Sequence, residues 1–119
     1  MKTREYNNLK LNLSKIAQNV SLLIEIAAAK TITQEQSFKI SLLYQSTIEL
    51  MYKTAAEFLI IKGEAEKAAA LTEKRINQKK AVQLTNESLK ELNDFLELNI
   101  PAKFLMMEST NIGKPLTKK

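Results

Sequence analysis

Three acidic side chains in the last third of the chain are the first candidates for chemistry. Glu87, Asp94 and Glu97 fall on one face of a predicted helix, because spacings of three and seven residues return to the same side of a helix. Paired carboxylates support acid–base catalysis where burial or a second negative charge raises the pKa of one of them. These three lie opposite the apolar stripe of the same segment. We therefore expect them to be solvated and to have no catalytic role.

The residue types that carry most other chemistry are missing. The 119 residues include no His, no Cys and no Trp. Without His the chain has no imidazole base, and without His or Cys the usual zinc, iron–sulfur and thiolate sites cannot form. A di-metal helical bundle also needs His beside its carboxylates. We expect no catalytic residue, no cofactor, no metal ligand and no enzymatic activity.

Basic residues give the chain a formal net charge of +5 and a pI near 9.4. If residues 64–84 form one helix, its basic residues Lys67, Lys74, Arg75 and Lys79 share an arc of about 140°. Such an arc suits binding to a nucleic-acid backbone. The alternative is a solvated helix face balanced by Glu66 and Glu73. The candidate nucleic-acid-binding residues are Lys67, Lys74, Arg75, Lys79, Lys114, Lys118 and Lys119.

The elements that must position these residues are helices. Strand-like alternation is absent, and Ala, Leu, Lys, Glu and Gln are abundant, which favours an all-α fold. We expect an antiparallel bundle of about four helices, with residues 1–108 as one domain and 109–119 as a flexible basic tail. Hydrophobic residues make up 45% and charged residues 26% of the chain, which is ordinary globular usage.

The first predicted helix runs to about Lys30 and carries apolar residues on two faces. Its main seam repeats at alternating spacings of three and four residues, the pattern of a packed helix. Leu11, Leu22 and Ala29 fall together on the opposite side. A second apolar stripe needs a second packing partner, so we predict that these three residues mediate self-association. The seam comprises Tyr6, Leu9, Leu13, Ile16, Val20, Leu23 and Ala27.

The second predicted helix has well-marked ends. Thr33 and Gln36 fit a capping box at its start, and Gly63 fits the position that follows a helix C-terminus. Apolar residues cover more than half of its circumference, which predicts a central helix with several neighbours.

The rest of the chain leaves more choices open. The sequence does not decide whether residues 64–100 form one helix or two, with Thr85 as the candidate cap of a second one. We expect that helix to end at Ile100, before Pro101, and a short fifth helix to follow. Its apolar residues are either a docking segment for a partner or a lid over the end of the bundle. They are Phe104, Leu105, Met106 and Met107.

Residues 40–63 resemble the second helix of the nucleotidyltransferase substrate-binding, HEPN-like helical bundles. Tyr52 stands where that family has Trp. The resemblance implies a bundle that is often dimeric. It also implies no ribonuclease activity, because the family's catalytic motif requires a histidine. The residues that agree with the family pattern are Thr47, Glu49, Leu50, Lys53, Thr54, Leu59 and Gly63.

Together these features predict a non-catalytic helical binding protein that forms a homodimer and contacts a protein partner. One alternative is a nucleic-acid-binding accessory factor of the mobile-element or phage type, and another is an immunity or anti-effector protein. No apolar stretch is long enough to span a bilayer, and the first eight residues lack the apolar core of a signal peptide. We therefore expect a cytoplasmic protein without membrane association.

Overall fold

The computed structural model describes residues 2–29 and 31–107, and within them it contains helices and no strand. The elements are α1 (Lys2–Ala27), α2 (Gln34–Ile61), α3 (Ala65–Thr72), α4 (Gln78–Leu96) and the short 3-10 helix η1 (Ala102–Phe104). The predicted all-α bundle of about four helices is confirmed. The predicted flexible tail, with Lys114, Lys118 and Lys119, lies outside the described residues.

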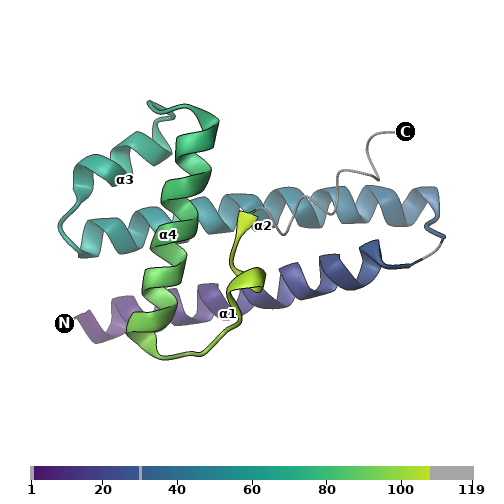
Figure 1. Cartoon of the computed structure of the whole chain (residues 1–119), viewed down its shortest axis with the longest axis horizontal. Coiled ribbons are helices and arrows are strands. Elements are labelled where there is room, and N and C mark those ends of the chain that lie inside the picture. Colours follow the sequence, from purple (N-terminus) through teal and green to yellow (C-terminus); the bar gives the residue numbers. More distant parts are fainter. Residues whose placement is uncertain (1, 30, 108–119) are drawn as a thin grey trace.

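The long helices α1 and α2 form an antiparallel hairpin (Figure 1). Five residues of the predicted α1 seam are at most 1% exposed: Leu9, Leu13, Ile16, Val20 and Leu23. The predicted capping box at the start of α2 is present. Thr33 Oγ1 accepts a hydrogen bond from the Gln36 backbone N–H at 3.1 Å, and Gln36 Oε1 accepts one from the Thr33 N–H at 2.9 Å. These bonds satisfy N–H groups that the first turn of a helix otherwise leaves free.

Helix α2 is the central element, since it packs against α1, α3 and α4. It ends where predicted, with Lys62 as the C-cap and Gly63 at φ 86°. Glycine adopts this left-handed conformation without the steric cost that a Cβ imposes.

The region between Glu64 and Ile100 forms two helices, which answers the question that the sequence left open. The break lies at residues 73–77, and Asn77 caps α4 by accepting a hydrogen bond from the Lys80 N–H at 2.8 Å. Of the two alternatives for Thr85, the helix continues through it: Thr85 lies inside α4, is fully buried and caps no helix. Figure 1 shows α4 crossing the hairpin steeply, with α3 beside the end of α2.

The end of α4 also differs from the prediction, because the helix stops at Leu96 and not at Ile100. Glu97 and Asn99 adopt positive φ values of 55° and 59°. The Asn93 side chain holds the turned chain in place, since its amide donates to the Ile100 carbonyl at 2.9 Å and its oxygen accepts from the Ile100 N–H at 3.3 Å. The predicted fifth helix is present only as the single turn η1.

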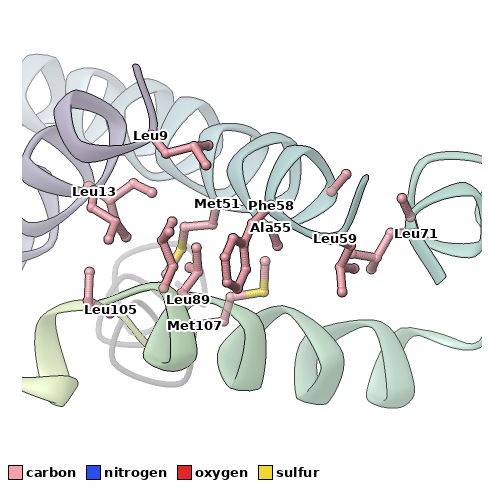
Figure 2. Close-up of a cluster of buried hydrophobic side chains, with 14 of the residues drawn as sticks. Leu9, Leu13, Met51, Ala55, Phe58, Leu59, Leu71, Leu89, Leu105 and Met107 are labelled. Carbon is pink, nitrogen blue, oxygen red and sulfur yellow. The ribbon is translucent and has the colours of Figure 1, made fainter. Parts of the chain in front are cut away.

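The hydrophobic core lies where α1, α2 and α4 meet, and the segment after η1 closes it (Figure 2). Leu89 and Leu92 of α4 are fully buried, as is Met51 of α2. Leu105 and Met107 are 1% and 4% exposed. In Figure 2 their side chains point into the same cluster as Leu13, Met51 and Leu89. The core therefore occupies the half of the hairpin that α4 crosses.

Candidate functional site: apolar surfaces of the helical hairpin

The outer face of α1 exposes the residues predicted for self-association. The exposed fraction is 68% for Leu11 and 44% for Leu22. Ala29 is also exposed, and it lies just beyond the end of α1, in a turn where its N–H donates to the Ile26 carbonyl at 3.0 Å. The structure thus places all three predicted residues on the surface.

The end of the hairpin that carries the α1–α2 connection extends past α3 and α4 in Figure 1. We call this part, residues 22–29 and 31–43, the distal end. A groove of about 440 Å³ lies between its two helices, lined on the α1 side by Leu22, Ile26 and Ala29 and on the α2 side by Ile40 and Leu43. The molecule measures 47 × 30 × 19 Å. A thickness of 19 Å is about two helix diameters, so the α1–α2 hairpin has room for other helices on one of its faces and not on both.

Two further apolar side chains of the distal end were not predicted as functional residues. Phe38 and Leu42 of α2 are 65% and 53% exposed. The sequence signal was their position at the back of the predicted second helix, one turn apart. They add to the apolar surface of the distal end, on the side of α2 that faces away from its buried residues.

A second groove, of about 640 Å³, runs along the other side of the α1 outer face. Its floor includes Gln18, Leu22 and Glu25 of α1, and its far wall is the turned segment from Leu98 to Pro101 together with Phe104. Leu22 and Glu25 therefore form a ridge between this groove and the groove of the distal end.

A third groove, of about 850 Å³, separates α2 from α4. Tyr44, Ile48 and Tyr52 line it from α2, and Val82 and Asn86 line it from α4. Burial and, to a smaller extent, the neighbouring Tyr44 raise the pKa of Tyr52 above its usual value of 10.0. The Tyr52 phenol therefore remains a neutral hydrogen-bonding group near neutral pH, which suits binding and not acid–base chemistry.

The predicted basic surface is not a single helix face. Residue Lys67 lies in α3, Lys74 and Arg75 lie in the α3–α4 connection, and Lys79 lies in the first turn of α4. The prediction of a common arc was wrong, because α3 ends at Thr72 and the four residues do not belong to one helix. Two of the cations also have carboxylate neighbours: Lys67 Nζ lies 3.1 Å from Glu64, and Arg75 Nε lies 3.2 Å from Glu73.

The predicted docking segment is not free to enter a partner's groove. Leu105 and Met107 are buried, and Phe104 and Met106 are half-buried. The Met107 N–H donates to Asn86 Oδ1 at 2.9 Å, which ties this segment to α4. The lid alternative is the one that the structure supports, because these side chains complete the core.

The acidic residues considered for catalysis are all exposed: Glu87, Asp94 and Glu97. Across residues 2–29 and 31–107, no group of three or more carboxylates is arranged to hold a metal ion. None of the helices within these residues is both long and apolar enough to cross a membrane.

A charged cluster joins the end of α2 to α4. Lys62 Nζ lies 2.7 Å from Glu91 of α4 and 3.5 Å from Glu64, and it sits 5.3 Å from the centre of the Phe58 ring. The hydrogen bond to Glu91 raises the pKa of Lys62, and the hydrogen bond from Lys67 lowers the pKa of Glu64. The cluster ties the end of α2 to α4.

Comparisons with protein-family models, with curated proteins and with solved structures find no match for this chain. The resemblance of residues 40–63 to the HEPN-like bundles therefore stays a prediction. Three of its matching residues, Thr47, Thr54 and Leu59, are buried in α2. A core position restricts residue type through packing alone, so these matches have a structural explanation that involves no function.

Proposed function

We propose that this protein is a non-catalytic binding module that self-associates through the outer face of α1. The observation that carries the proposal is the exposure of Leu11 and Leu22 on a helix whose opposite face is buried from Leu9 to Leu23. Burial of exposed apolar side chains is the main favourable contribution to protein association. A cytoplasmic setting and a further protein partner belong to the same proposal.

The shape of the molecule supports self-association in particular. Most oligomers of soluble proteins are twofold dimers in which the same patch contacts itself. Two of the three predicted residues, Leu22 and Ala29, lie in the distal end, which extends past α3 and α4 and is therefore accessible to a second copy (Figure 1). Pairing two hairpins through their α1 helices yields a four-helix arrangement, which buries the α1 face that one hairpin leaves exposed.

Sedimentation equilibrium over a concentration series tests the proposal. We expect the mass to rise from one chain towards two between about 1 and 200 µM, because a surface formed by one helix face gives a small interface of modest affinity. A mass of one chain at every concentration would overturn the proposal.

A double variant separates association from folding. Leu11→Lys with Leu22→Lys places two like charges in the proposed contact, so the dimer should be lost while the circular dichroism spectrum and the melting temperature of the dilute protein stay unchanged. The matched control, Phe38→Lys with Leu42→Lys, changes two exposed apolar residues on α2 and should leave the dimer intact. Equal loss in both variants would place association elsewhere or make it non-specific.

A parallel titration with labelled DNA and RNA tests the alternative function, nucleic-acid binding. The dispersion and partial pairing of the basic residues do not favour it. Binding at about 50 mM salt that weakens by powers of ten towards physiological salt would support that alternative over our proposal.

A further inference from the structure

The outer face of α1, together with Ala29 in the turn that follows it, carries one continuous stripe of exposed side chains. Its members are separated by four, three, four, three and four residues, the spacing that keeps side chains on one line of a helix. All six are exposed. In chain order they are Leu11, Lys15, Gln18, Leu22, Glu25 and Ala29.

The order of residue types in this stripe is self-complementary. The stripe reads apolar, basic, amide, apolar, acidic, apolar, so reversal of its direction places the basic position opposite the acidic one and an apolar end opposite the other apolar end. In an antiparallel pair centred at the level of Val20, Leu11 faces Ala29, Lys15 faces Glu25 and Gln18 faces Leu22. Each of these contacts occurs twice, as a twofold axis requires.

The charges in the stripe have no other use in the described parts of the chain. Neither Lys15 nor Glu25 forms an ion pair there. Ten residues separate them, which is about 15 Å along the helix axis, so they cannot pair with each other within one chain. A second α1 running in the opposite direction brings an opposite charge to each of them.

We propose that the occupant of this face is a second copy of the chain, with the two α1 helices packed antiparallel about a twofold axis near Val20. Lys15 of each copy then pairs with Glu25 of the other across the α1–α1 interface. This inference rests on the proposed self-association and specifies its geometry. The grooves on the two sides of Leu22 and Glu25, of about 440 and 640 Å³, receive the flanking side chains of the partner helix. A parallel arrangement is disfavoured because it places Lys15 against Lys15 and Glu25 against Glu25.

The α1–α1 interface is short, and its length sets the expected affinity of the dimer. From Leu11 to Glu25 the helical part of the stripe is about 21 Å long. One helix face of this length contributes less than the roughly 800 Å² per partner of a standard interface. The dimer is therefore expected to dissociate in the micromolar range, where its dissociation constant is easy to measure.

Charge reversal tests the pairing. Lys15→Glu and Glu25→Lys should each weaken the dimer about tenfold, since each replaces two attractive contacts by two repulsive ones. The double variant K15E/E25K should restore the wild-type dissociation constant. The matched controls Lys53→Glu and Glu49→Lys make the same charge changes at exposed positions of α2 and should leave the constant unchanged. A double variant that dimerises no better than the single ones would overturn the proposed pairing.

Disulfide formation tests direction and register independently, because the natural chain has no cysteine. Lys15→Cys and Glu25→Cys chains, mixed and mildly oxidised, should crosslink to each other, while each variant alone should not. A disulfide needs Cα atoms within about 7 Å, and identical positions in this antiparallel pair lie about 15 Å apart along the axis. The mixed pair also keeps one intact Lys15–Glu25 contact.

The outcomes distinguish this inference from the proposed function. Two results would overturn the antiparallel α1–α1 interface and leave self-association standing. One is rapid crosslinking of either single variant alone. The other is no crosslinking in the mixture while the wild-type mass is that of two chains. A wild-type mass of one chain at every concentration would remove both.

Discussion

The two ends of the α1–α2 hairpin differ in what covers them. At one end α3, α4 and the segment after η1 lie against the hairpin, and the residues there form the core, with Leu13, Met51 and Leu89 completely buried. The distal end has only two helices in contact, and Leu22, Phe38 and Leu42 remain exposed. The comparison teaches that one hairpin can contain a folded region, which stabilises the chain, and an incompletely covered region, which is available for association.

The largest difference should appear when a leucine is shortened in each region. Leu89→Ala leaves a cavity in the core and should lower the free energy of unfolding by about 3 kcal/mol. Leu22→Ala, made on the exposed surface, should change it by less than about 0.5 kcal/mol. Urea denaturation of dilute protein measures both values. Equal effects would mean that the distal end belongs to the core.

The pair of hydrogen bonds between the Asn93 side chain and the Ile100 backbone, which we call the Asn93 clamp, should give the next largest effect on the free energy of unfolding. Asn93→Ala removes both hydrogen bonds to the Ile100 backbone and leaves those polar groups half-buried without a partner, which should cost about 2 kcal/mol. Asn99→Gly is the control for the loss of an exposed amide nearby, because glycine tolerates the positive φ of 59° at that position. Hydrogen exchange at Leu105 and Met107 should accelerate in the Asn93 variant alone, and unchanged protection there would show that the clamp does not hold the lid.

The capping box should have a smaller and more local effect, because it lies in the uncovered region. Thr33→Ala removes an N-cap and should cost about 1 kcal/mol. The loss should appear mainly as faster hydrogen exchange in the first turns of α2. Thr31→Ala, a nearby exposed threonine outside the capping box, should leave the exchange rates unchanged. Acceleration that extends equally into α4 would mean that the two regions unfold as one unit.

The ion pairs at the end of α2 should give the smallest effect, since the partners are partly exposed. Lys62→Met should cost about 0.5 kcal/mol near neutral pH. The pKa of Lys62 is raised in the folded state, so its contribution is fully present below the unfolded value of 10.5 and is lost as the pH rises above it. The stability difference between wild type and Lys62→Met should therefore shrink above pH 10.5. A difference independent of pH would assign the effect to packing on Phe58.

The sequence predicted the hairpin well because its signals are local. The seam from Leu9 to Leu23 follows helical spacing, and Thr33 and Gly63 mark helix ends by side-chain chemistry and by backbone freedom. The exposure of Leu11 and Leu22 followed from the same periodicity. These features require only that a helix forms and that one of its faces is buried.

The α3–α4 region was harder to predict because its signals conflict. Residues 65–72 are rich in alanine, which favours a helix without marking a buried face, and the break after them contains neither Gly nor Pro. The actual cap, Asn77, has a suitable side chain but follows Ile76 in an otherwise helical sequence. The positive φ values of Glu97 and Asn99 accompany the hydrogen bonds between Asn93 and Ile100, a contact between residues seven apart that periodicity does not reveal.

The groove between α2 and α4 has a consequence for binding strength. No residue of α1 lines it, so a dimer joined through α1 displays two copies of this groove, each with its own Tyr44 and Tyr52. A ligand with two suitable segments, or two ligands fixed on one surface, can then occupy both grooves at once. Such bivalent attachment can raise the apparent affinity by a factor of about 100 or more without a new contact. Because the α1–α1 dimer is expected to be of modest affinity, the fraction of bivalent binding would then rise steeply with protein concentration.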